Sequence, residues 1–209
     1  MSKTMTRLFD NYSDAKAAVR ELEALGIAHD DLSIVANNAD GAHGEHDNDG
    51  IDDINDHGDV TRGTSTGAVL GGVGGLLAGL GLLAIPGLGP IVAAGWLAST
   101  AVGAGIGAAG GAATGGIVGA LKNAGHSDEE AHVYSEGVRR GGTLVSARVP
   151  EDRIAEAEAI LHRNKSVDAA TRGEAYRGAG WSAFDEGAPP YSPDEVLAER
   201  ERYTSTRAI

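Results

Sequence analysis

The N-terminal region alternates hydrophobic and polar positions in the order strand, helix, strand. Residues 4–10 alternate apolar and polar side chains, which is typical of a half-buried strand. Residues 13–25 begin with a serine that can cap a helix, and their apolar side chains recur on one helical face. Gly26 ends this helix, and residues 31–37 have the pattern of a second strand. This region therefore predicts one β-α-β unit.

A similar pattern returns in the C-terminal half of the chain. Residues 142–149 predict a strand, residues 150–164 a helix that starts with proline, and residues 166–172 a weaker strand. A capping-box pattern at Ser127 and Glu130 predicts a short connecting helix before them. Two β-α-β halves of this size indicate the α+β class, with a split ferredoxin-like sheet interrupted by an insertion.

The insertion is uncharged and rich in glycine. Residues 63–121 contain no Asp, Glu, Lys, Arg or His, and glycine recurs at every fourth position in two rows. Residues four apart lie along one ridge of a helix, so a row of glycines lets another helix approach closely. We therefore expect a glycine-zipper α-helical hairpin over 63–122, with helices at 66–85 and 90–122 joined by a tight turn. The glycines expected to pack these helices are Gly63, Gly67, Gly71, Gly75, Gly79, Gly95, Gly103, Gly107, Gly111, Gly115 and Gly119.

The predicted hairpin leads to three hypotheses for function. A helix over 66–85 would be about 30 Å long, which matches the hydrocarbon thickness of a bilayer. The first hypothesis is a non-enzymatic inner-membrane protein that self-assembles through its glycine rows and keeps its charged domains on the cytoplasmic side. The second is an oligomeric pore or channel. The third is a soluble, cytoplasmic assembly or ligand sensor that uses the ferredoxin-like sheet. A hairpin that zips only to itself is the alternative to self-assembly.

Composition narrows the set of partners. The formal net charge of -13 argues against a nucleic-acid interface, which requires clustered Lys and Arg. Cysteine is absent, which excludes disulfides and thiolate metal sites. Charged residues near the amino terminus predict that no signal peptide directs export. We expect a homo-oligomer in contact with a lipid bilayer, with no cofactor and no catalytic residue.

An acidic, histidine-containing linker at 38–62 is the candidate for metal binding. Its carboxylates fall near the ligand offsets of a twelve-residue calcium loop, but Asp56 stands where a bidentate Glu is usual. A transition-metal site using His43, His46 and His57 is an alternative, and a solvated linker without metal is the third interpretation. The weak metal candidates are Glu45, Asp47, Asp49, Asp53 and Asp56.

The C-terminal residues 173–209 form a tail with a second capping-box pattern, at Ser192 and Glu195. Its large side chains could anchor it across a surface as a tether, and a disordered tail with a transient helix is the alternative. Upstream, Arg139 and Arg140 precede two glycines, which predicts either an anion site or a basic turn that leads into the next strand. The predicted organisation is 1–37 first half, 38–62 linker, 63–122 hairpin, 123–172 connecting helix and second half, and 173–209 tail.

Three stretches carry a resemblance to a known family: "RLFDNYSDAKAAVRELEALGIAHDDLSIVANN", "GLLAIPGLGPIVAAG" and "EEAHVYSEGVRRGGTLVSARV". Together they resemble bacterial general stress proteins with a YflT-type (heat-induced stress protein) domain, some of which are described as low temperature-induced proteins. The resemblance covers residues 5–170 or so. It implies a stress-response association and a glycine-zipper membrane segment, and it implies no catalytic residues.

Overall fold

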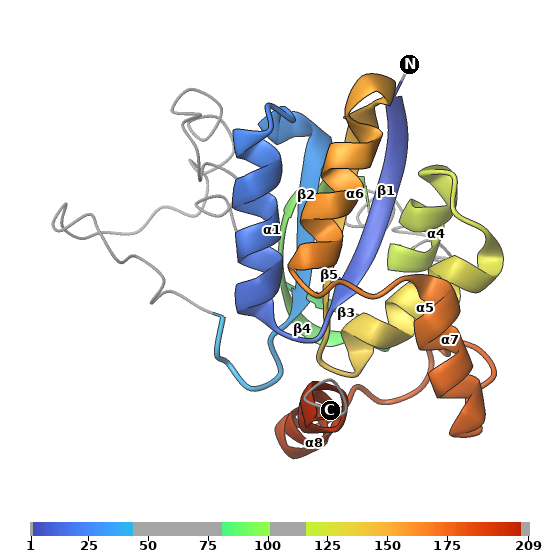
Figure 1. Cartoon of the computed structure of the whole chain (residues 1–209). Coiled ribbons are helices and arrows are strands. Elements are labelled where there is room, and N and C mark those ends of the chain that lie inside the picture. The colour runs from blue at the N-terminus through green and yellow to red at the C-terminus, as the bar shows by residue number, and fades with distance from the viewer. Residues whose placement is uncertain (1, 44–80, 101–115, 206–209) are drawn as a thin grey trace, which may run out of the picture.

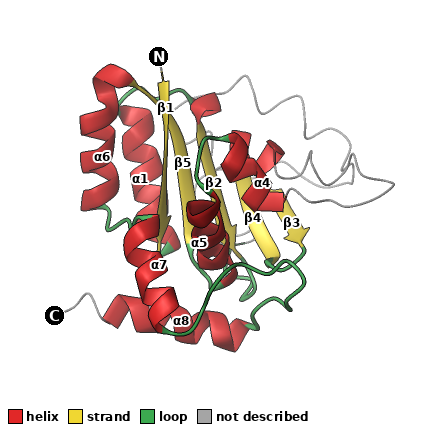
Figure 2. Ribbon diagram, turned by 90° about the vertical axis from the view of Figure 1, so that its right-hand side faces the viewer, coloured by secondary structure: helices red, strands yellow, loops and turns green. Residues whose placement is uncertain are grey.

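The computed structural model describes residues 2–43, 81–100 and 116–205. These residues form a mixed α+β structure in which a five-stranded antiparallel sheet lies between helices on both faces (Figures 1 and 2). The α+β class predicted from the sequence is thereby confirmed.

The strands follow the order β1-β5-β2-β4-β3 across the sheet. Strand β5 therefore lies between β1 and β2, the two strands of the predicted N-terminal unit. The bounds are β1 Ser2–Phe9, β2 Leu32–Asn37, β3 Gly81–Ile85, β4 Gly89–Gly95 and β5 Thr143–Pro150.

Helices α1 and α6 cover one face of the sheet, and α4, α5 and α7 lie on the other (Figure 2). Helix α8 lies beyond the end of the sheet, at the bottom of both views (Figures 1 and 2). The bounds are α1 Tyr12–Ala24, α4 Gly116–Asn123, α5 Asp128–Arg139, α6 Ile154–Arg163, α7 Ala169–Gly178 and α8 Pro193–Ser205, with short 3₁₀ turns η1 His29–Asp31 and η2 Glu151–Arg153.

Strands β1, β2, β4 and β5 each supply side chains to both hydrophobic cores because their residues alternate between the two faces of the sheet. On β1, Phe9 belongs to the core beneath α1 and α6, whereas Leu8 belongs to the core beneath α4, α5 and α7. On β2, Ile34 and Val35 divide in the same way. This alternation is why the sequence pattern predicted β1, β2 and β5 at their observed places.

The second predicted β-α-β half is only partly realised. Val167 forms an isolated bridge with Leu8 through backbone hydrogen bonds of 2.9 and 2.7 Å. Asp168 then caps helix α7, its side chain accepting a 2.7 Å hydrogen bond from the backbone N–H of Thr171. Because aspartate is a favourable N-cap and alanines follow it, the chain continues as a helix. The strand predicted over 166–172 is therefore wrong beyond its first two residues.

Residues 81–95 contradict the predicted helical hairpin. They form the β-hairpin of β3 and β4 instead of the end of one helix and the start of another. Strand β4 pairs with β2 from Asn37 opposite Ile91 to Ser33 opposite Gly95. This pairing satisfies backbone groups along β2 that an uncovered buried edge would leave without partners. An apolar run is compatible with either a helix or a strand, and here the sheet edge decides.

The predicted membrane span is also wrong. Within the parts of the chain that the structure describes, no helix has both the length and the apolar composition that crossing a bilayer requires. The remaining residues of the predicted hairpin, 63–80 and 101–115, lie outside the described residues. The hypothesis of a membrane-inserted glycine zipper is therefore withdrawn, and the ligand-sensor alternative is the one to test against the folded domain.

Candidate functional site

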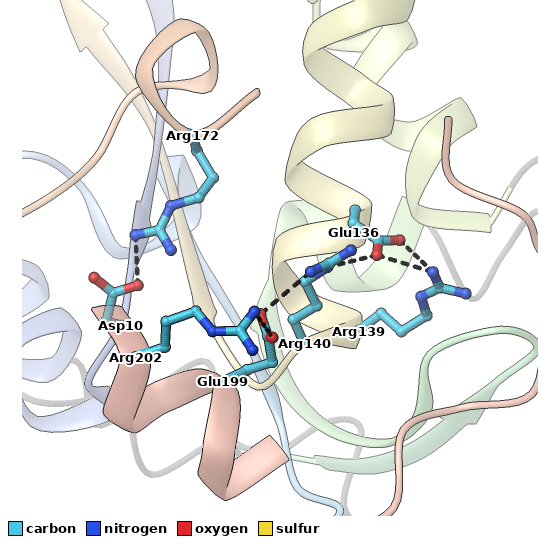
Figure 3. A network of polar contacts seen from close by, with 7 residues as sticks. All are labelled: Asp10, Glu136, Arg139, Arg140, Arg172, Glu199 and Arg202. Carbon is cyan, nitrogen blue, oxygen red and sulfur yellow. Dashed lines mark hydrogen bonds and ion pairs between the residues drawn. The ribbon is translucent and has the colours of Figure 1, made fainter. Parts of the chain in front are cut away.

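Arginine side chains from three helices gather at one end of the sheet, where α5 ends and α8 crosses (Figure 3). Carboxylates from the same elements and from the ends of β1 and β2 lie among them. We call this group the arginine cluster. It consists of Arg139, Arg140, Arg172, Arg200 and Arg202 with Asp10, Asp40, Glu136 and Glu199.

The end of α5 places the first two arginines. Its start has the predicted capping box, in which Ser127 Oγ accepts from the N–H of Glu130 and Glu130 Oε2 accepts from the N–H of Ser127, at 3.2 and 2.9 Å. Its end is followed by Gly141 at a φ of +101°, which turns the chain toward β5. A Cβ on Gly141 would lie 2.6 Å from Val196 Cγ1 of α8. Glycine here both makes the turn and lets α8 approach the end of α5.

Glu136 holds these two arginines from inside the fold. Its side chain is fully buried, and its Oε1 accepts hydrogen bonds from Arg139 Nη2 at 2.8 Å and from Arg140 Nε at 2.6 Å. Burial alone would lower the pKa of Arg140, but the hydrogen bond and the charge of Glu136 outweigh it and raise that pKa above its usual value. The guanidinium of Arg140 therefore stays charged in a partly dry environment.

A second buried ion pair joins β1 to α7. Arg172 Nη2 donates to Asp10 Oδ1 at 2.6 Å, and the two side chains are only 4% and 6% exposed. The guanidinium of Arg172 also lies 3.9 Å from the ring centroid of Tyr203 on α8, a cation–π contact. One arginine thus connects three elements that are far apart in the sequence.

Helix α8 covers the cluster with charges of both signs. Glu199 accepts hydrogen bonds from Arg140 Nη1 at 3.2 Å and from Arg202 Nη1 at 2.6 Å (Figure 3). Arg200 Nε donates to the carbonyl of Gly141 at 2.8 Å, and its guanidinium pairs with Asp40. The predicted capping box at the start of α8 is present, and the tail packs on the domain as far as Tyr203.

Aromatic rings fill the space between the guanidinium groups. Arg140 lies over the ring of Tyr176 at 4.5 Å and over that of Tyr191 at 5.7 Å, and Arg139 lies over Phe184 at 5.6 Å. Burial raises the pKa of Tyr176 well above its usual value, although the charges of Arg172 and Arg140 oppose this shift. Tyr176 is therefore a neutral phenol at any physiological pH.

A small cavity lies inside the cluster. Its volume is about 10 Å³, which is room for about one water molecule. Its wall includes Arg140, Arg172, Arg200, Tyr176, Tyr203 and Glu199. The cavity combines fixed positive charge with planar rings, and α8 closes it.

The sequence-predicted candidates fall largely elsewhere. Arg139 and Arg140 lie in the cluster, where Glu136 and Glu199 are the anions they bind. Of the ladder glycines, Gly95 lies in β4 and Gly119 in α4. Gly63, Gly67, Gly71, Gly75, Gly79, Gly103, Gly107, Gly111 and Gly115 lie outside the described residues, as do the metal candidates Glu45, Asp47, Asp49, Asp53 and Asp56.

No group of three His, Cys, Asp or Glu side chains within the described ranges is arranged to hold a metal ion. His43, the one described histidine of the proposed transition-metal set, stacks on the ring of Tyr12 with the centroids 4.1 Å apart.

A second polar cluster lies between strands β1 and β5 and the start of helix α5. Thr6 Oγ1 is 2.7 Å from His126 Nε2 and 2.9 Å from Ser146 Oγ, and Tyr134 donates to the carbonyl of Thr6 at 2.7 Å. Glu130 Oε2 is 3.7 Å from His126 Nδ1, so a carboxylate, an imidazole and the hydroxyl of Thr6 lie in a row in space. The hydroxyl residues Thr6 and Ser146 are 1% and 0% exposed, so no substrate reaches them in this conformation. The group serves to satisfy buried polar atoms.

Sequence reasoning missed most of the arginine cluster. The partners Arg172 and Asp10 are 162 positions apart, and Arg140 and Glu199 are 59 apart, so no local spacing joins them. The one local signal was Glu136, three and four residues before the two arginines on the same helix. The chain matches no protein-family model, no curated protein and no solved structure. The resemblance to bacterial stress proteins therefore stays a prediction.

Proposed function

We propose that this chain is a non-enzymatic sensor whose arginine cluster binds a small oxyanion of the phosphate or carboxylate type. The observation that carries the proposal is the cavity into which Arg140, Arg172 and Arg200 all face. Guanidinium groups present a planar fork of donors that matches the oxygens of carboxylate and phosphate. The carboxylates of Asp10 and Glu199 already occupy two of these forks, which is the same recognition made within the chain.

The chemistry of the cluster supports binding more than catalysis. Arginine does not exchange protons near neutral pH, so it orients and neutralises an anion without acting as an acid or a base. The buried Glu136 fixes the direction of Arg140, and the ring of Tyr176 supports its flat face. A site held in this way is preorganised, which lowers the entropy lost when a ligand binds.

The sheet gives this proposal its framework. We infer a ferredoxin-like core from β1, α1, β2, β5 and α6, because β5 lies between β1 and β2 and both helices cover one face. The bridge from Leu8 to Val167 stands where the last strand of that arrangement belongs. Strands β3 and β4 then extend the sheet at the β2 edge. Self-assembly through the glycine rows remains a separate prediction.

Isothermal titration calorimetry with inorganic phosphate, pyrophosphate and succinate tests the proposal. We expect at least one of the three anions to bind, and Arg140→Gln to weaken that binding at least tenfold because it removes the central fork. Arg177→Gln is the matched control, since Arg177 lies on α7 but pairs with Glu129 at the surface. Circular dichroism checks the fold of each variant. Calorimetry is preferred to melting curves because phosphate stabilises many proteins without binding a specific site.

Two outcomes would refute the proposal. One is the absence of a binding isotherm for all three anions at millimolar concentration, both for the unmodified chain and for Glu199→Gln, in which α8 loses its ion pair with Arg140. The other is binding that Arg140→Gln and Arg177→Gln reduce equally, which would indicate a general surface effect of charge.

A further inference from the structure

Helix α8 closes the proposed site, and the size of the cavity shows why this matters. The space of about 10 Å³ accommodates one water molecule, whereas a phosphate or carboxylate group with its several heavy atoms requires more room. An oxyanion can therefore reach Arg140 and Arg172 only if one wall of the cavity moves.

The walls differ in how firmly they are attached. The ends of β1, α5 and α7 are joined to the sheet by the apolar core and by the buried pair of Arg172 and Asp10. Helix α8, in contrast, has one fully buried apolar side chain, Val196, among its described side chains. Leu197 beside it is 47% exposed. Segments with few buried apolar contacts open at the lowest cost in free energy, so α8 is the wall that moves.

Glu199 makes α8 a competitor for the anion. Glu199 is only 7% exposed, and its carboxylate accepts a hydrogen bond from Arg140, the arginine that Glu136 holds in place from the other side. If α8 leaves, Arg140 keeps Glu136 and Arg172 keeps Asp10, but Arg140 loses Glu199 and Arg172 loses the ring of Tyr203. The departure thus exposes two oriented guanidinium groups beside the ring of Tyr176.

We propose that α8 is a displaceable latch in which Glu199 occupies the anion site as an internal ligand, so that an external oxyanion binds by releasing the helix. This inference rests on the proposed function and adds the structural change by which anion binding would be signalled. Binding is converted into exposure of α8 and of the surface it covered, which is the change a downstream partner would detect. By linkage, a substitution on α8 that weakens the latch but leaves the anion-binding arginines intact strengthens anion binding by the same factor, as long as the closed form dominates.

Calorimetry with inorganic phosphate and with succinate, on the full-length chain carrying Glu199→Gln, tests the latch. Glutamine keeps the size of the side chain but removes the competing charge, so we expect the anion to bind about fivefold tighter or more. The matched control is Glu174→Gln, which makes the same change of net charge at an exposed position of α7. The control should bind as the unmodified chain does.

Hydrogen–deuterium exchange on the unmodified chain gives a second readout that no substitution can disturb. Backbone amides of residues 196–203 should exchange faster when the anion is bound, while those of α5 should exchange at the same rate or more slowly. Equal affinity of Glu199→Gln and the unmodified chain, with unchanged exchange in α8, would overturn the latch and leave the anion site standing. Failure of every variant, including Glu199→Gln, to bind either anion would overturn the site itself and the latch with it.

Discussion

The buried pair of Arg172 and Asp10 gives a sharp test of how the arginine cluster holds the domain together. We consider Asp10→Ala, Arg172→Met and the double variant. The pair spans 162 positions of sequence and joins β1 to α7 through a 2.6 Å hydrogen bond, with both side chains less than a tenth exposed. Each single variant leaves the other charge of the pair inside the fold.

The expected magnitude follows from that burial. Removing one partner of a buried ion pair costs about 3–5 kcal/mol of unfolding free energy, since the remaining charge loses its compensation. Arg172→Met also loses the cation–π contact with Tyr203, which adds about 1 kcal/mol. The double variant should be less damaging than the sum of the two, with a coupling energy of about 2–3 kcal/mol, because it buries no lone charge.

Urea unfolding, monitored by circular dichroism, gives the unfolding free energy of the unmodified chain, the two single variants and the double variant. Repeating it in 0.5 M sodium chloride distinguishes a buried ion pair from an exposed one, because salt screens exposed charges more strongly. The matched comparison is the pair of Arg7 and Glu158, 3.3 Å apart with Glu158 59% exposed, for which we expect less than about 1 kcal/mol and a clear loss in salt. A coupling energy for the Arg172 pair as small and as salt-sensitive as that of the surface pair would show that the reasoning from burial is mistaken.

Two further predictions concern the sheet and the second polar cluster. Gly95→Ala should cost about 2 kcal/mol or more in urea unfolding, because φ is +88° and a Cβ would lie 2.1 Å from the carbonyl oxygen of Leu32; Gly178→Ala, with open space around it, should be neutral or slightly stabilising. Burial lowers the pKa of His126 below 6.5, so the unfolded chain binds this proton first as the pH falls. Stability should therefore decrease from pH 7 toward pH 5, and His126→Gln should remove that part of the dependence while His162→Gln retains it; parallel pH profiles for the unmodified chain and His126→Gln would contradict the assignment.

The sequence predicted those parts of the fold in which the pattern has only one interpretation. Strands β1, β2 and β5 and helix α5, which begins with a complete capping box, were therefore predicted near their observed bounds, and for α8 the capping box predicted the start alone. The pattern of residues 81–95 does not distinguish a helix from a strand. Their apolar side chains fit a helix and a strand equally, and the four-residue spacing of glycines favoured the helix, whereas pairing with β2 is a tertiary interaction that no local pattern reports.

The candidate site was less accessible to prediction for a related reason. Arg139 and Arg140 stand out in the sequence because two glycines follow them, and their interpretation as an anion site was one of two alternatives. The carboxylate that decides their role, Glu199, comes from a helix whose docking depends on Val196 and on the turn at Gly141. Such a contact exists only once the whole domain is folded.

The position of β5 in the middle of the sheet also sets the order in which the chain can fold during synthesis. Strands β1 and β2 leave the ribosome early but do not pair with each other; β4 can pair with one edge of β2 before β5 emerges, whereas the other edge of β2 and the facing edge of β1 wait for β5. The N-terminal unit therefore emerges with two apolar edges that find their common partner only after Pro150 has cleared the exit tunnel. Such non-local pairing is slow, and it leaves these strand edges exposed to other chains until β5 is in place.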